Sequence, residues 1–158
     1  MKNLVLFFAF VLSLSAIYAQ GGNVYANKEN VAIDGYDVVN YFTNYQSVKG
    51  TKEFSAKHDG SIFYFKSAEH LQLFKENPEK YIPEYGGYCS FAMAEKNAKV
   101  YCEPSTFKIR NGKLYLFFND DYEGQHVNTI VPWNTDEEEK IKKADANWAK
   151  LKTNKTKN

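Results

Sequence analysis

The sequence has few of the residues that build disulfide scaffolds and metal clusters. Its 158 residues include only two cysteines, Cys89 and Cys102, together with three histidines and two methionines. Two cysteines are too few for a disulfide scaffold, although they allow one bridge in an oxidising compartment. The motifs Cys-x-x-Cys, Gly-x-Ser-x-Gly and His-Glu-x-x-His and a glycine-rich phosphate loop are all absent. The sequence therefore gives no support to a thioredoxin-type exchanger, a serine hydrolase, a zinc protease or a kinase.

An excess of charge of either sign is also lacking. Lysine and arginine number 20, aspartate and glutamate number 19, and the two signs are interspersed along the chain. This balance gives the protein no electrostatic reason to bind nucleic acid or an anionic membrane, so we expect neither as a partner. The lysine-rich end of the chain, residues 152–158, is expected to be a flexible tail.

A long hydrophobic run occurs only at the N-terminus. Lys2 precedes a nearly continuous apolar stretch from Leu4 to Leu14, and Ala19 offers a small residue where signal peptidase cuts. The stretch is shorter than the roughly 20 apolar residues that a membrane helix needs. We predict a signal peptide over residues 1–19, export as a periplasmic or secreted protein, and no membrane anchor after cleavage.

The length of the chain leaves room for one domain, which we place at residues 31–151 after a disordered lead-in at 20–30. Apolar residues at three- and four-residue spacings predict helices. In chain order these helices are expected at 68–76, 88–96, 121–129 and 136–151.

Two hairpins are expected between these helices. The runs 52–66 and 106–118 are rich in β-branched and aromatic residues and are interrupted by Asp59-Gly60 and Asn111-Gly112. Such dipeptides are typical of type I′ turns, in which both central residues need a positive φ. Two hairpins and several helices predict an α+β fold, with a small antiparallel sheet built from the hairpins and helices packed on it.

Several blocks of the sequence follow one another in an order that covers nearly all of residues 31–151. The blocks are Ala32-Ile33-Asp34-Gly35-Tyr36-Asp37-Val38-Val39, His58-Asp59-Gly60 with Phe63-Tyr64-Phe65-Lys66-Ser67-Ala68-Glu69, Phe74 with Asn77-Pro78-Glu79-Lys80-Tyr81, Tyr85-Gly86-Gly87-Tyr88-Cys89-Ser90, Gly112-Lys113-Leu114-Tyr115-Leu116, and Ala144-Asp145-Ala146-Asn147-Trp148. Taken together and in this order, they resemble the YHS-domain family in its exported branch.

The resemblance implies a small α+β domain and either redox or soft-metal chemistry at Cys89, because some members of this branch have selenocysteine at that position. The metal-linked members of the wider family carry further cysteines in the opening motif and after the first hairpin. Here those places are occupied by Gly35-Tyr36 and by Lys66. A multi-cysteine metal site is therefore not transferred, and Cys102 has no expected counterpart in the family.

Cys89 is the first candidate for a functional residue. It follows Gly86-Gly87 and lies near the expected start of a helix, where unpaired backbone N–H groups and the helix dipole stabilise a thiolate. A thiolate is both a nucleophile and a ligand for soft metals. The alternative is a buried cysteine that packs as a small hydrophobic side chain.

A soft-metal site is the first hypothesis for its chemistry. Met93 follows Cys89 by four residues, so the two side chains are expected to share a helix face. Thiolate and thioether ligands together suit Cu(I). His58 or Cys102 would complete the ligand set, whereas the alternatives are a methionine that only packs and a histidine that is a partly exposed turn residue.

A pairing of Cys89 with Cys102 competes with the metal site. Asn97 marks a reversal of the chain that would bring the two cysteines together, either as a structural disulfide or as a redox pair in which Cys102 resolves oxidised Cys89. His70 and His126 are expected to be exposed on helices. The tyrosines are expected to pack at the rim of the core, with a small-ligand pocket as the alternative.

The sequence thus favours a monomeric binding module over an enzyme. Its first predicted ligand is copper or another soft metal ion, bound by Cys89 with Met93 and with His58 or Cys102. A thiol redox protein that uses Cys89 and Cys102 is the alternative from the enzyme class. A structural or small-molecule-binding domain with an inert cysteine is the third.

Overall fold

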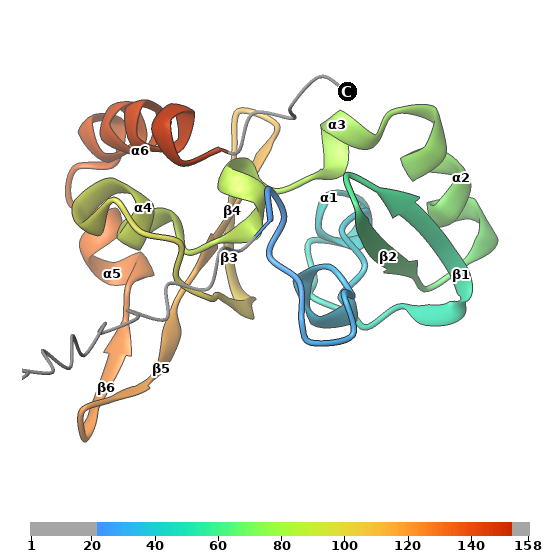
Figure 1. Ribbon diagram of the computed structural model, residues 1–158, viewed down its shortest axis with the longest axis horizontal. Coiled ribbons are helices and arrows are strands. Elements are labelled where there is room, and N and C mark those ends of the chain that lie inside the picture. Colours follow the sequence, from blue (N-terminus) through green and yellow to red (C-terminus); the bar gives the residue numbers. More distant parts are fainter. Residues whose placement is uncertain (1–21, 153–158) are drawn as a thin grey trace, which may run out of the picture.

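The computed structural model describes residues 22–152, and Figure 1 shows that they form two halves side by side. The predicted signal peptide and most of the predicted tail, at 153–158, lie outside the described residues. None of the helices between residues 22 and 152 has the length and hydrophobicity that crossing a bilayer would require.

The fold is α+β, as predicted. Its helices, with two short 3₁₀ turns, are η1 (Ile33–Gly35), α1 (Asn40–Asn44), α2 (Ala68–Glu76), α3 (Pro78–Tyr81), η2 (Glu84–Gly87), α4 (Ser90–Lys96), α5 (Ile130–Trp133) and α6 (Glu137–Leu151). Its strands are β1 (Thr51–His58), β2 (Ser61–Phe65), β3 (Glu103–Arg110), β4 (Lys113–Phe117), β5 (Asn119–Tyr122) and β6 (Gln125–Asn128).

Both predicted hairpins are present with the expected turns. Strands β1 and β2 are antiparallel and joined by Asp59 and Gly60, whose φ angles are 47° and 83°. Strands β3 and β4 are joined in the same way by Asn111 and Gly112, at 51° and 73°. Positive φ at both central residues is the type I′ conformation that the two dipeptides predicted.

The expectation that these hairpins form one sheet is wrong. In the described part of the chain the strands form three separate two-stranded sheets, β1–β2, β3–β4 and β5–β6. The reason lies in β4, which is buried on both faces. Its Leu114 and Leu116 enter the core of one half, which also contains Phe63 of β2, whereas Tyr115 and Phe117 enter the core of the other. Strand β4 is therefore the wall between two cores rather than an extension of β1–β2.

The prediction of a helix at 121–129 is also wrong. This segment belongs to a third hairpin, in which Glu123 and Gly124 form the turn with φ angles of 50° and 77°. Tyr122 pairs with Gln125 on either side of the turn. Glutamate is not a residue that favours positive φ, so this turn has no Asn-Gly or Asp-Gly signature to reveal it.

Part of the segment expected to be a disordered lead-in packs between the two halves: residues 23–26 are buried or half-buried and Tyr25 packs against both cores, whereas residues 27–30 are exposed. Val24 is buried, and Tyr25 donates its backbone N–H to the carbonyl of Gly86 at 2.8 Å. A side chain at Gly86 would place its Cβ 1.9 Å from the Asn23 carbonyl oxygen, so this crossing requires glycine.

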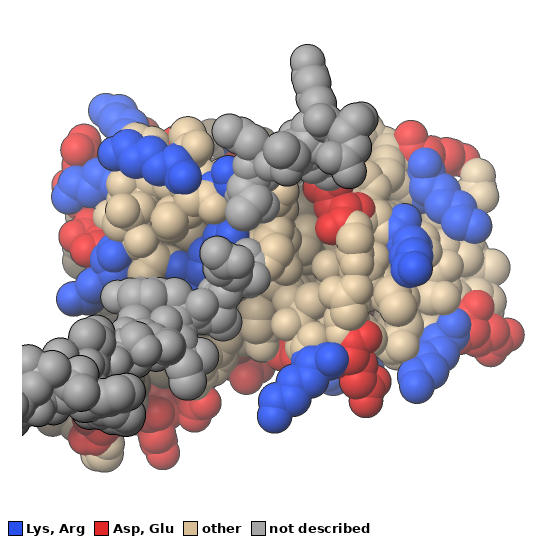
Figure 2. All heavy atoms as spheres, in the orientation of Figure 1, with Lys and Arg blue, Asp and Glu red and all other residues tan. Residues whose placement is uncertain are grey.

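Helix α6 closes the second core, as its amphipathic pattern predicted. Ala144 is fully buried, and Ile141, Trp148 and Leu151 pack against the same cluster of apolar side chains. Helices α6 and α4 lie against each other in the half on the left of Figure 1. Figure 2 shows basic and acidic side chains interspersed over the visible face, in agreement with the balanced composition.

Candidate functional site

The sulfur of Cys89 accepts hydrogen bonds from two backbone N–H groups. Cys89 is the N-cap of α4, so the helix begins two residues later than the predicted start at residue 88. Its Sγ lies 3.5 Å from the nitrogen of Ala92 in the first turn and 3.3 Å from the nitrogen of Phe118. The residue is fully buried. N–H groups that point at a sulfur from which water is excluded stabilise negative charge on it.

Thr129 supplies the third contact with this sulfur. Its Oγ1 lies 3.4 Å from Cys89 Sγ and also donates a hydrogen bond to the carbonyl of Phe118 at 2.9 Å. The backbone N–H of Thr129 donates to the same carbonyl. Three elements therefore converge on one thiol: the start of α4, the end of β4 and the residue after β6.

The chain returns after α4 and brings the segment that leads to Cys102 next to Cys89, but the Cys102 side chain packs in a different cluster. Asn97 ends α4 with a left-handed φ of 50°, and the chain returns so that Cys89 donates its backbone N–H to Val100 at 2.9 Å. Two residues later, Cys102 is buried in the first core, apart from the small cluster around Cys89. Burial, together with the nearby Asp34 carboxylate, raises the pKa of the Cys102 thiol. Both cysteines are free thiols in the structure.

Met93 shares helix α4 with Cys89 but not its surroundings. Its backbone N–H donates to the Cys89 carbonyl at 3.0 Å, while its side chain is fully buried among Trp133, Tyr115 and Phe117. The expected common face does not form, because Cys89 at the N-cap has an extended ψ of 115° instead of helical backbone angles. The side chain of an N-cap residue turns back onto the first helical turn.

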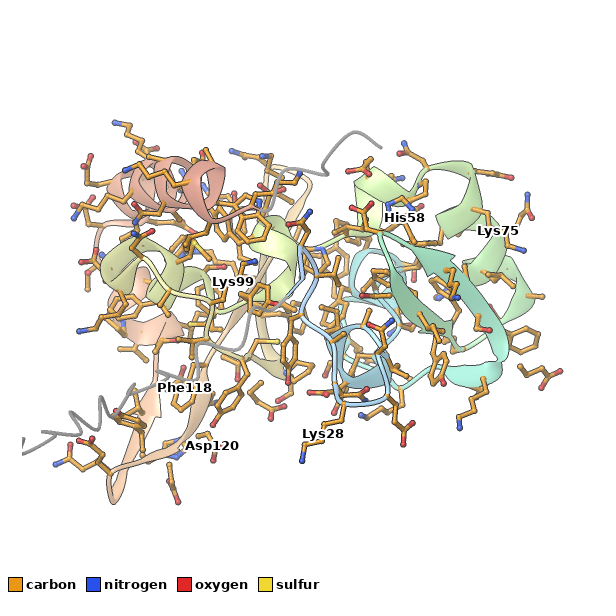
Figure 3. All side chains as sticks on the ribbon, in the orientation of Figure 1. Lys28, His58, Lys75, Lys99, Phe118 and Asp120 are labelled. Carbon is orange, nitrogen blue, oxygen red and sulfur yellow. The ribbon has the colours of Figure 1, made fainter. Side chains whose placement is uncertain are left out.

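His58 is in the other half of the molecule, as Figure 3 shows by the places of His58 and Phe118. Its Nε2 lies 3.4 Å from Oε1 of Glu79, and its ring packs edge-on against Phe63 and Phe74. The structure therefore does not bring the four predicted metal ligands together. Within residues 22–152, no group of three or more His, Cys, Asp and Glu side chains is arranged to hold a metal ion.

A buried carboxylate–imidazole pair was not anticipated. His70, expected on the surface, is almost fully buried, and its Nδ1 lies 2.7 Å from Oδ2 of Asp37. Its other ring nitrogen is 3.4 Å from the hydroxyl of Thr43. His126, in contrast, is exposed on β6 and lies 3.1 Å from Asp121. The sequence gives little sign of the Asp37–His70 pair, because the two residues are separated by 33 positions.

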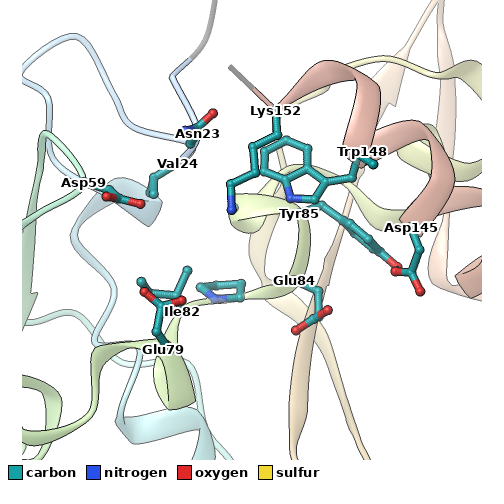
Figure 4. Close-up of a pocket in the computed structure, with 13 residues that line it drawn as sticks. Asn23, Val24, Asp59, Glu79, Ile82, Glu84, Tyr85, Asp145, Trp148 and Lys152 are labelled. Carbon is teal, nitrogen blue, oxygen red and sulfur yellow. The ribbon is translucent and has the colours of Figure 1, made fainter. Parts of the chain in front are cut away.

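A cleft of about 400 Å³ opens between the two halves. Figure 4 shows Asp59 and Glu79 on one side of it and Trp148 and Lys152 on the other. Tyr85, one of the tyrosines considered as a pocket residue, lines the cleft and donates its hydroxyl hydrogen to Asp145 at 3.0 Å. Cys89 is not among the lining residues, so the cleft and the thiol are separate features.

Comparisons of the chain with protein-family models, with curated proteins and with solved structures find no match. The resemblance to the YHS-domain family therefore remains a prediction from the sequence.

Proposed function

We propose that this protein is a thiol redox module in which Cys89 is the reacting group. The observation that carries the proposal is the pair of backbone N–H groups, from Ala92 and Phe118, that point at its buried sulfur. Donors fixed by a helix turn and a strand end are already in place when the thiol loses its proton and becomes the attacking thiolate. The bond from Ala92 is an ordinary N-cap contact, whereas a cysteine that only capped the helix would not need the second donor, from Phe118.

The proposed reaction uses a hydroperoxide as the oxidant. The Cys89 thiolate attacks one oxygen of the peroxide, so an S–O bond forms, the O–O bond breaks and an alkoxide leaves and takes up a proton. The cysteine is oxidised to a sulfenic acid, and the peroxide is reduced to an alcohol. A small external thiol then displaces water from the sulfenic acid and forms a mixed disulfide, and a second one releases Cys89 and leaves as the oxidised disulfide.

An external thiol is proposed because Cys102 is poorly placed to resolve the sulfenic acid. Cys102 is buried in a different core, and the raised pKa of its thiol keeps it protonated near neutral pH. The protonated thiol is a poor nucleophile.

The copper-binding hypothesis has less support from the geometry. A Cys89 site has only one soft ligand in the described structure, since Met93 and Cys102 pack in other clusters and His58 is paired with Glu79. Tight and selective Cu(I) binding uses two or more soft ligands. The predicted export would place the thiol in an oxidising compartment, which suits a redox role.

The test uses the protein recovered after export from a host cell. The mass of this protein also reports whether residues 1–19 have been removed. The reduced protein is treated with tert-butyl hydroperoxide in the presence of dimedone, which traps sulfenic acids, and adducts are mapped by mass spectrometry. We expect an adduct on Cys89, its loss in Cys89→Ser and its retention in Cys102→Ala.

Absence of the adduct, or equal labelling of both cysteines only after unfolding, would show that Cys89 is inert. A parallel Cu(I) titration against a chromophoric chelator distinguishes the metal-binding hypothesis from the redox proposal. Stoichiometric binding that Cys89→Ser abolishes, with no sulfenic acid formed, would favour a metal-binding protein instead.

A further inference from the structure

The β5–β6 hairpin, residues 119–128, is attached directly to the Cys89 site. It leaves the body of the protein after Phe118 and returns at Thr129, the two residues that hold the sulfur from one side. These two residues are bonded to each other through the Phe118 carbonyl, which accepts both the N–H and the hydroxyl of Thr129. Any tilt of the hairpin at its base therefore changes the wall of the thiol site.

The hairpin projects away from the rest of the molecule (Figure 1). Residues 120–126 are all exposed, and they include Asp120, Asp121 and Glu123 but no lysine or arginine. Figure 2 shows acidic side chains at this end of the visible face. In a chain whose charges otherwise balance, this is a local negative surface, and it would attract a positively charged partner.

Exposed aromatic side chains lie on the same surface. Tyr122 is 60% exposed at the turn, and Tyr101 is 45% exposed and donates its hydroxyl hydrogen to Asp120 at 3.1 Å. Tyrosine is enriched where proteins bind one another, because its ring packs while its hydroxyl remains able to form hydrogen bonds. Charge alone would serve to keep a free strand edge from aggregating, but that role does not call for exposed tyrosines.

A second acidic segment of the protein does not present the same unneutralised negative surface. At the start of α6, Glu137 and Glu138 are paired with Lys108 and Arg110, so cations of the protein itself neutralise them. Glu139 lies 3.9 Å from Lys142. With the preceding Asp136 this segment, residues 136–139, carries four carboxylates against three in the hairpin, so neutralising three of them provides a control matched in charge.

We propose that the β5–β6 hairpin is a docking arm for a basic protein surface, and that docking there changes access to Cys89. This inference rests on the proposed function, because the docked partner would deliver oxidising equivalents to the Cys89 thiol or remove them from it. Docking acts on the thiol by favouring one arrangement of Phe118 and Thr129 over another, since a partner shifts such an equilibrium by its different affinity for the two arrangements.

The experiment uses decalysine as the probe and decaglutamate as its control. Decalysine is titrated into isotope-labelled protein, and backbone amide shifts are followed by NMR. In parallel, the rate of Cys89 alkylation by iodoacetamide is measured with and without the peptide. We expect shifts at residues 119–128 and a change of at least about twofold in alkylation rate. The triple variant D120N/D121N/E123Q should lose both effects, whereas D136N/E138Q/E139Q should keep them.

A shortened variant tests the arm without neutralising any charge elsewhere. Replacing residues 119–128 by Asn-Gly leaves the bond from the Thr129 N–H to the Phe118 carbonyl as the closing bond of a two-residue turn. This variant should keep Cys89 reactive and lose the response to decalysine.

Three outcomes would overturn the proposal: no shifts at 119–128, equal shifts at 136–139, or binding to the hairpin that leaves the alkylation rate unchanged. Self-association through the hairpin, detected as shifts that depend on protein concentration without the peptide, would also overturn it in favour of a second copy as the partner. Failure of the redox function is seen separately, as absence of dimedone labelling in a protein whose alkylation still responds to decalysine.

Discussion

His70 places its Nδ1 2.7 Å from Oδ2 of Asp37, and this contact joins helix α2 to the segment that leads into α1. The carboxylate of Asp37 is fully buried and makes three further hydrogen bonds. They come from the backbone N–H groups of Val39, Asn40 and Lys66. A buried carboxylate with a complete set of hydrogen-bond donors stabilises the packing of this half of the protein.

Replacing this carboxylate should cost a large part of the stability of the protein. In Asp37→Asn the side-chain NH₂ would face N–H donors, and the negative charge opposite His70 would be lost. We expect the free energy of unfolding to fall by about 3 kcal/mol, the scale found when one partner of a buried pair is removed. Urea denaturation followed by circular dichroism measures the change.

The matched control is Asp121→Asn, which removes the carboxylate of the exposed Asp121–His126 pair. An exposed pair contributes only about 0–1 kcal/mol. Equal losses in the two variants would mean that the buried network has no special role.

Local signals in the sequence predicted the elements that they encode, but not how these elements meet. Asp59-Gly60 and Asn111-Gly112 predicted their hairpins because those residue types adopt positive φ readily. Apolar spacing predicted the helix at 68–76, which forms as α2, and the hydroxyl of Ser67 caps it by accepting the N–H of His70. The turn at Glu123 was missed because its residue type does not favour the conformation that it adopts.

The site around Cys89 was found only in part. The cysteine and its helix terminus are local features, but Phe118 and Thr129 lie 29 and 40 residues away from it. Phe118 contributes a backbone N–H, which every residue except proline carries, so its side chain gives no sign of the role. The buried partner of Asp37 was missed for the same reason of distance along the chain.

Gly86 should be the glycine least tolerant of a side chain. In Gly86→Ala the new Cβ would lie 1.9 Å from the Asn23 carbonyl, at a residue whose φ is 65°. The chain between Asn23 and Tyr25 would have to move, and we expect a loss of at least about 2 kcal/mol in unfolding free energy. The control is Gly60→Ala, where φ is also positive but no atom lies within 4 Å of the Cβ. There the loss should be about 1 kcal/mol, and a larger loss than at Gly86 would contradict the packing described here.

Glu137 should make the protein sensitive to acid. Burial alone would raise the pKa of this carboxyl. The hydrogen bonds from Trp133 and Lys108, with the charges of Lys108 and Arg110, outweigh that effect and hold the pKa below its ordinary value of 4.5. A folded-state pKa below the unfolded one gives stability that is present above about pH 4.5 and is lost as the pH falls through the folded value.

We therefore expect Glu137→Gln to destabilise the protein by about 1 kcal/mol at pH 7, the scale of a partly exposed charged hydrogen-bond network. The difference between the two proteins should narrow as the pH falls below 4.5. Thermal unfolding measured from pH 7 downwards tests this. A difference that stayed constant over that range would show that the ionised carboxylate is not what stabilises the folded state.

Cys102→Ala separates a structural thiol from a resolving one. Because Cys102 is buried in the first core, its truncation should lower the unfolding free energy by about 1 kcal/mol through lost packing. Because its thiol is held protonated by burial, its removal should leave the steady-state reduction of tert-butyl hydroperoxide by an external thiol within about twofold of the unchanged protein. If turnover instead stopped and oxidised Cys89 accumulated, Cys102 would have to reach the Cys89 sulfur in every cycle. Its core would then open on the timescale of catalysis, and backbone amides around Cys102 should exchange with solvent faster during turnover than at rest.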